Sequence, residues 1–173
     1  NFITTPKEQK DEIMVVEADE YDRSFLMLSP DIAIITAMDA DHLDIYGSKE
    51  IMVDAYRSFA GKVKEKGTLL VKRENAVEIN NTKRTLLHCF NTLTYSINSK
   101  ADYYSTGIVV KNKKFYFNYK SDKNNIENIE LQIPGRHNIE NAVAASAVAS
   151  LIGIKPEQIK KGLESFKGVK RRF

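Results

Sequence analysis

The 173-residue sequence predicts an α/β fold in which helices flank a mostly parallel sheet, with a small antiparallel β elaboration. Two short apolar, β-branched runs, at residues 13–16 and 32–35, are each followed by acidic residues. Such runs are typical of parallel strands that are buried on both faces. A helical pattern at residues 48–66 and a β-rich run at 68–71 complete the strand, strand, helix, strand order of crossover units.

Composition restricts the partners. The content of 42% hydrophobic and 28% charged residues is ordinary for a globular protein, and a net charge of +3 predicts no nucleic-acid partner. No apolar run approaches the roughly 20 residues that cross a membrane, so we expect no membrane partner. The single cysteine, Cys89, excludes an intrachain disulfide and fits a reducing cytoplasm as a plain buried thiol.

Polar side chains follow the first two expected strands. Glu17 comes directly after residues 13–16, and Asp39, Asp41, His42 and Asp44 come shortly after the second run. In open α/β sheets, ligands bind beyond the carboxyl ends of parallel strands. We therefore expect Glu17 and His42 to lie at one crevice rim, where a hard cation could be held against a phosphate.

The first long helix is expected at residues 48–66. Ser48 suits its N-cap and Gly67 its C′ position. An apolar stripe at helical spacing indicates a core-facing side rather than a cofactor site, and it consists of Met52, Tyr56, Phe59 and Val63.

A short helical or turn segment is expected at residues 21–26, ended by Pro30. Arg23 in this segment has two readings, a contact to an anionic substrate or an ordinary surface arginine.

The pattern changes at about residues 85–133, where short alternating runs predict antiparallel hairpins. The runs are residues 93–97, 103–110, 115–119 and 129–133, with a turn at Asn112 and Lys113. Lysines interleave with aromatic residues here. They fit an edge hairpin protected from pairing, with a nucleic-acid surface as the weaker alternative.

Residues 134–138 turn the chain into a small-residue helix expected at 138–152. Asn138 suits the N-cap and Asn141 the N3 position, so two amides gather at the helix start. They serve either as caps alone or also to read the edge of a flat heterocycle. Pro156 opens a last helix, and the basic residues near Arg172 are either solvated or a phosphate clamp.

Four stretches together resemble a known family: EADEYDRSFLMLSPD (17–31), DADHLDIYGS (39–48), PGRHNIENAVAASAVA (134–149) and FKGVKRRF (166–173). They are similar, in the same order, to the central domain of the Mur ligases. Within that family they are most similar to the branch that adds L-alanine to UDP-N-acetylmuramate.

The resemblance implies a cytoplasmic, ATP-dependent, amide-forming enzyme of peptidoglycan synthesis that works through an acyl phosphate. By motif, Glu17 and His42 correspond to catalytic Mg²⁺ ligands. His137, Asn138 and Asn141 correspond to nucleotide contacts, and Arg172 to a phosphate or nucleotide clamp. Phosphoryl transfer depends mainly on positioning and charge neutralisation, which such a site would supply. Because imidazole is an unusual Mg²⁺ ligand, we also expect Mn²⁺ to support activity.

Two departures from the family pattern matter. The sequence has no GxxxxGK[ST] phosphate loop. We therefore expect residues 1–173 to be a central-domain fragment, without the N-terminal and C-terminal domains and inactive alone, whose open sheet edge could pair with a second copy. Several relatives carry a carbamylated lysine where this chain has Arg57, which argues against the ligases that add later peptide residues. A solvated helix position is the other reading of Arg57.

Three alternatives to the alanine ligase remain open on the sequence. One is the recycling ligase that joins the same sugar to a tripeptide. Another is a non-catalytic binding module. The third is a metal-dependent hydrolase that uses Asp39, Asp41, His42 and Asp44.

Overall fold

The structure is a computed structural model that describes residues 12–38, 43–80 and 91–169. Its elements in chain order are η1 (Ser24–Met27), β1 (Ile32–Ile35), α1 (Leu43–Tyr46), α2 (Lys49–Ala60), β2 (Thr68–Lys72), α3 (Arg73–Asn80), β3 (Asn91–Ser96), β4 (Tyr103–Lys111), β5 (Lys114–Ser121), β6 (Asn125–Leu131), α4 (Arg136–Leu151) and α5 (Pro156–Ser165). None of the helices in these residues is long and apolar enough to span a membrane.

One mixed sheet joins the described strands in the order β1-β2-β3-β4-β5-β6. The pairs β1·β2, β2·β3 and β3·β4 are parallel, whereas β4·β5 and β5·β6 are antiparallel. The expected mostly parallel α/β sheet with an antiparallel part is thus confirmed. The carboxyl ends of β1, β2 and β3 consequently share one edge of the sheet.

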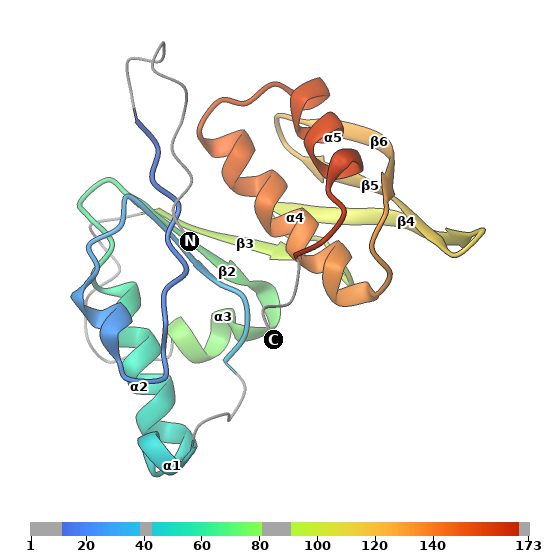
Figure 1. Cartoon of the computed structure of the whole chain (residues 1–173). Coiled ribbons are helices and arrows are strands. Elements are labelled where there is room, and N and C mark those ends of the chain that lie inside the picture. The colour runs from blue at the N-terminus through green and yellow to red at the C-terminus, as the bar shows by residue number, and fades with distance from the viewer. Residues whose placement is uncertain (1–11, 39–42, 81–90, 170–173) are drawn as a thin grey trace.

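The two faces of the sheet are covered by different helices. Leu69 and Val71 of β2 belong to a core shared with α2 and η1, while Leu70 between them belongs to a second core shared with α4 and α5. Side chains of a strand alternate between faces, so one apolar strand feeds both cores. Figure 1 shows α1 and α2 on one side of the sheet and α4 and α5 on the other.

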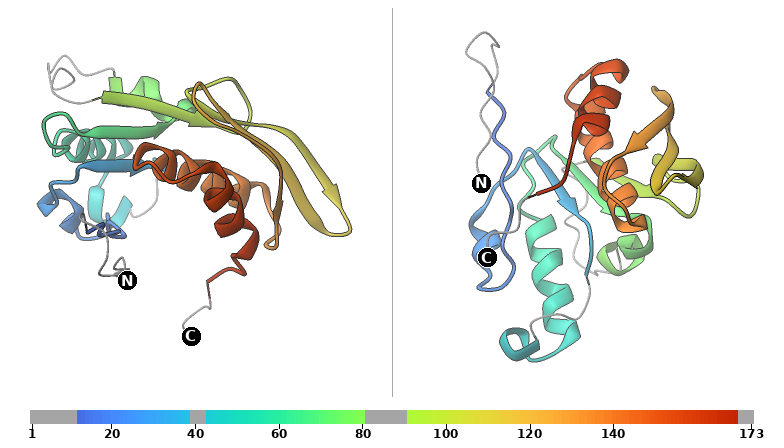
Figure 2. Two further views of the ribbon diagram at one scale, coloured as in Figure 1. Left: turned by 90° about the horizontal axis from the view of Figure 1, so that it is seen from above. Right: turned by 45° about the vertical axis from the view of Figure 1, so that its right-hand side comes forward.

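The antiparallel part forms a long ribbon. Asn112 and Lys113 have φ of 52° and 63°, the left-handed conformation at both central residues of a type I′ hairpin turn, as the sequence predicts. Figure 2 shows β4 and β5 extending beyond the helices. Lys114 pairs with Glu130 of β6, which agrees with a solvated hairpin.

The expected strand at residues 13–16 is wrong. These residues have no strand partner in the described part of the chain, and Met14, Val15 and Val16 are exposed. A strand is defined by its ladder partner, which an apolar run does not specify by itself. The self-association expected through an open sheet edge is not tested, although β1 is the terminal strand among those described.

The first long helix is shorter than expected. Ser48 is its N-cap, with Oγ accepting from the Ile51 N–H at 3.4 Å, but α2 ends at Ala60 and is capped by Gly61. Gly67 instead allows close approach to the residue before β1, because an added Cβ would lie 2.6 Å from the Asp31 carbonyl oxygen.

The expected antiparallel pairing of residues 93–97 is also wrong, because β3 lies parallel to both neighbours. Asp102 explains the path into β4. Its carboxylate accepts from both the backbone N–H and the hydroxyl of Thr94 at 2.7 Å. These two hydrogen bonds hold the beginning of β4 next to β3, and the two strands run parallel.

Candidate functional site

The first turn of α4 lies at the carboxyl ends of β2 and β3. Lys72, the last residue of β2, places Nζ 3.0 Å from Glu140 Oε1 in α4. Arg136, the first residue of α4, donates from Nη2 to Asn98 Oδ1, just beyond β3, at 2.9 Å. The two contacts fix the start of α4 at the edge where open α/β sheets bind ligands.

The three expected nucleotide contacts of α4 are brought together there. His137 and Asn141 are exposed and Asn138 is half-buried. The expected capping arrangement is wrong, because the N-cap is Gly135 and Asn138 lies within the first turn, where its amide donates to the Pro134 carbonyl. That bond leaves the carbonyl end of the Asn138 amide, with its two lone pairs, for a ligand.

Gly135 shapes this corner. Its φ is 113°, and an added Cβ would lie 2.5 Å from His137 Cε1. An L side chain rarely adopts this φ, so glycine allows both the turn into α4 and the position of the imidazole.

A polar contact lies at the end of β3. Ser96 Oγ donates to Glu74 Oε1 at 3.3 Å, which connects β3 to α3. Burial, together with the nearby Glu140 and Glu74 carboxylates, strongly raises the pKa of Tyr95. Tyr95 is therefore a neutral phenol at physiological pH.

Glu17 is exposed and precedes a tightly bonded turn. In this turn Asp19 Oδ1 accepts from Tyr21 N–H at 2.9 Å and the Asp19 carbonyl accepts from Phe25 N–H at 3.1 Å. Phe25 is 2% exposed and packs against the rings of Tyr56 and Phe59 on α2, with centroids 5.7 and 5.1 Å away. The aromatic contact anchors the Glu17 turn to α2.

A second anchor comes from Tyr46, the last residue of α1. Its ring is buried, and its hydroxyl donates to the Glu20 carbonyl. The Arg23 guanidinium lies over the ring, 5.0 Å from its centroid, while the residue is exposed. The interpretation of Arg23 as a surface arginine agrees with this position, and its contact to an anionic substrate stays a prediction. Burial raises the pKa of Tyr46, which keeps the hydroxyl protonated as a donor.

Several expected site residues lie outside the described residues: His42, Arg172, Asp39 and Asp41. Within the described residues no three His, Cys, Asp or Glu side chains gather as a metal site. Glu17 nevertheless fits Mg²⁺, which keeps several waters and binds proteins through only one or two carboxylates. The pairing of Glu17 with His42 remains a prediction.

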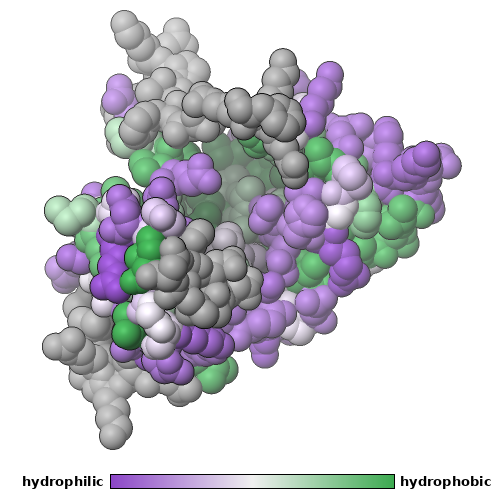
Figure 3. Space-filling model, turned by 60° about the horizontal axis from the view of Figure 1, so that its bottom comes forward, coloured by the Kyte–Doolittle hydropathy of each residue, from purple (hydrophilic) through white to green (hydrophobic). Residues whose placement is uncertain are grey.

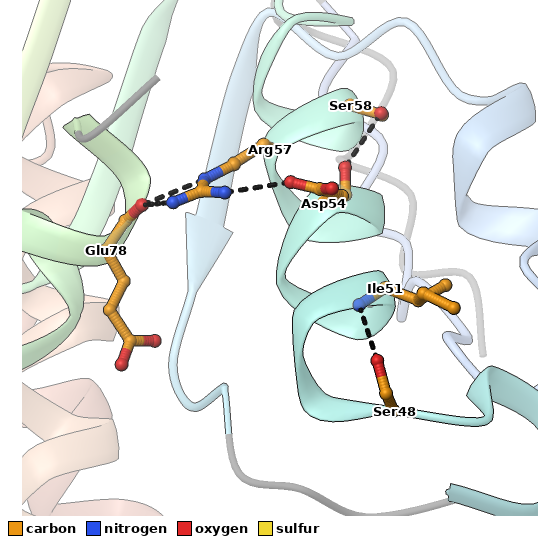
Figure 4. Close-up of polar contacts among 6 residues, drawn as sticks. All are labelled: Ser48, Ile51, Asp54, Arg57, Ser58 and Glu78. Carbon is orange, nitrogen blue, oxygen red and sulfur yellow. Dashed lines mark hydrogen bonds and ion pairs between the residues drawn. The ribbon is translucent and has the colours of Figure 1, made fainter. Parts of the chain in front are cut away.

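Arg57 has a structural contact rather than a solvated position. Its Nε and Nη2 donate to the Glu78 carbonyl near the end of α3, at 2.9 and 2.7 Å, and Nη1 lies 2.8 Å from Asp54 Oδ1 (Figure 4). The guanidinium therefore ties α2 to α3. A groove of about 300 Å³ lies here, lined by Lys49, Glu50, Val53, Asp54, Arg57 and Glu78.

Figure 3 shows a hollow in the face brought forward from below, with apolar side chains at its floor and hydrophilic ones among the side chains around it. A floor of this kind beside polar walls is typical of ligand sites.

Comparison with known proteins decides the family. The Mur ligase middle domain model matches residues 1–149. The chain belongs to the Mur ligase middle-domain family. It is 42% identical to the UDP-N-acetylmuramate--L-alanine ligase of Christiangramia forsetii over 165 residues, which cover 95% of this chain and 34% of that protein.

Two further relatives agree with this Mur ligase assignment. The ligase of the same name from Phocaeicola vulgatus is 43% identical over 162 residues, 94% of this chain and 34% of that protein. The crystal structure of MurC from Thermotoga maritima has the same fold, with a TM-score of 0.70 at 24% identity over 90% of this chain and 34% of that one. The chain thus spans about a third of the length of the curated relatives it matches.

Two residues that position parts of the candidate site, Lys72 and Tyr46, were not predicted from the sequence. The signal for Lys72 was a cation directly at the end of an apolar strand. The signal for Tyr46 was a large aromatic residue within the polar stretch at 39–48.

Proposed function

We propose that this chain is the central, ATP- and Mg²⁺-binding domain of a longer cytoplasmic ligase that joins L-alanine to UDP-N-acetylmuramate in peptidoglycan synthesis. The observation that carries the proposal is its identity of 42% and 43%, over nearly the whole chain, to two ligases of that name. The tripeptide-adding recycling ligase remains the alternative.

The roles of the residues follow from the chemistry. ATP phosphorylates the muramoyl carboxylate, and the alanine amine then displaces phosphate from the acyl phosphate. Glu17 and His42 would hold Mg²⁺, which when bound would neutralise charge on the phosphates, and Mn²⁺ is expected to substitute. Glu17 supplies the oxygen ligand that both ions accept, and its turn is fixed to α1 and α2 by Tyr46 and Phe25.

The nucleotide base is assigned to the start of α4. His137, Asn138 and Asn141 lie in the first two turns of α4, which Lys72 and Arg136 attach to the sheet. A carboxamide matches the donor and acceptor edge of adenine, and an imidazole can stack on its face. Arg172 is the proposed clamp for phosphate, since a guanidinium binds phosphate oxygens in pairs.

The test uses the full-length protein that contains this chain. We expect phosphate release from ATP that requires UDP-N-acetylmuramate, a divalent metal and L-alanine together. Faster turnover with the tripeptide than with alanine would favour the recycling ligase. Nucleotide binding without any ligation would favour a binding module, and metal-dependent phosphatase activity of the 173-residue chain alone would favour a hydrolase.

A further inference from the structure

Tyr46 connects two segments that are distant in the sequence. It ends α1, while its hydroxyl donates to the Glu20 carbonyl in the turn that follows Glu17. Its ring is 2% exposed and belongs to the core shared with α2 and β1. A buried ring has few rotamers, so the hydroxyl is held at one place.

The other side of the contact is equally constrained. The Glu20 carbonyl also accepts from the Arg23 N–H at 3.2 Å, and Arg23 has a left-handed φ of 61°. This conformation is uncommon for a residue with a side chain and persists where surrounding contacts enforce it. The Arg23 guanidinium then lies over the Tyr46 ring, 5.0 Å from the centroid.

We propose that Tyr46 is a positioning residue for Glu17: its hydrogen bond to the Glu20 carbonyl holds the turn so that the Glu17 carboxylate is placed for a divalent cation. The inference rests on the proposed function, because it takes Glu17 as a metal ligand. Phe25 fixes the far end of the same turn to α2, and Tyr46 connects the half nearer Glu17 to α1.

The test compares two tyrosine substitutions in the full-length protein. Tyr46→Phe removes the hydroxyl and keeps the ring. Tyr119→Phe is the matched control, since Tyr119 is 0% exposed and its hydroxyl bonds Ser150 Oγ at 3.1 Å in the other core. The probe is Mn²⁺ with a non-hydrolysable ATP analogue, and the concentration of free Mn²⁺ is followed by electron paramagnetic resonance.

We expect Tyr46→Phe to raise the half-saturating Mn²⁺ concentration about fivefold, the equivalent of one hydrogen bond. Hydrogen exchange at the Arg23 and Phe25 amides should also become faster, while the KM for alanine stays unchanged. Tyr119→Phe should lower the melting temperature without moving Mn²⁺ affinity. Arg23→Gln, which leaves the core intact, should shift Mn²⁺ affinity about twofold in the same direction.

Two results would overturn the inference: wild-type Mn²⁺ affinity in Tyr46→Phe and Arg23→Gln, or an equal shift in Tyr119→Phe. A failure of the proposed function would give a different experimental result. In that case the wild-type protein shows no ATP-dependent ligation, and Glu17→Ala binds Mn²⁺ as the wild type does.

Discussion

Lys72 and Glu140 form an ion pair of 3.0 Å between the end of β2 and the second turn of α4, with side chains only 24% and 19% exposed. The pair connects the parallel sheet to the helix that carries His137, Asn138 and Asn141. In a half-buried setting, removing one partner leaves the other charge uncompensated, which costs more than the loss of a surface pair.

Lys72→Met should therefore lower the stability of the protein by about 1 to 3 kcal/mol and weaken ATP binding in the full-length protein. Chemical denaturation and calorimetric titration with ATP measure the two effects. The matched control is Lys64→Met, whose pair with Asp31 is 52% and 81% exposed and should contribute about 0.5 kcal/mol or less. Equal losses in both variants would contradict a special role for Lys72.

Replacing a glycine by alanine should change the stability of the protein in opposite directions at two positions. Gly135→Ala forces a Cβ to within 2.5 Å of the His137 ring at a φ of 113° and should destabilise by about 1 to 3 kcal/mol. Gly162→Ala, inside α5 with nothing within 4 Å of the added Cβ, should stabilise by about 0.5 to 1 kcal/mol. Thermal unfolding of both variants checks the prediction, and destabilisation by Gly162→Ala would refute it.

Arg57→Lys should destabilise although it keeps the charge. A lysine has no planar fork to bond the Glu78 carbonyl twice and Asp54 as well, so we expect a loss of about 1 to 2 kcal/mol. Denaturation measures this loss. The kcat of the full-length enzyme should remain close to that of wild type, and a large fall in kcat with unchanged stability would instead place Arg57 in the reaction.

Glu130 should make stability depend on pH. Hydrogen bonds from Lys114, Tyr116 and Gln132 lower its pKa from 4.5 to about 2. A lowered folded-state pKa adds stability that is present above the unfolded value and is lost as the pH falls through the folded value. The melting-temperature difference between wild type and Glu130→Gln should thus be full near pH 7, shrink below about pH 5 and vanish near pH 2. A constant difference would contradict the assignment.

Local patterns predicted the parts of the fold that depend on neighbouring residues. Ser48 caps α2, and Asn112 and Lys113 form the hairpin turn, because side-chain capping and left-handed turns are decided within a few residues. Residues 13–16 have the composition of a strand but no strand partner among the described residues. β3 pairs in parallel with β4, and a hydrogen bond from Thr94 to Asp102 holds the two strands together. Both outcomes depend on contacts that a local pattern does not contain.

The candidate site likewise has a part that local sequence predicts and a part that depends on tertiary contacts. Sequence motifs predicted His137, Asn138 and Asn141 as nucleotide contacts, and these residues lie at the start of α4, which Lys72 and Arg136 connect to the sheet edge. The cap at Gly135 and the ion pair of Lys72 depend on where α4 meets the sheet, which no local spacing reveals. The role of Tyr46 likewise arises from a contact between two distant segments.

The central claim is that Glu17 and His42 hold a divalent cation at the carboxyl edge of the parallel sheet. Its most direct test is the anomalous difference map of Mn²⁺ in crystals of the full-length protein with a non-hydrolysable ATP analogue and UDP-N-acetylmuramate. We predict a manganese peak bonded to the Glu17 carboxylate and the His42 imidazole, in contact with nucleotide phosphate. A manganese ion bound to phosphate alone, with both side chains directed elsewhere, would contradict the account.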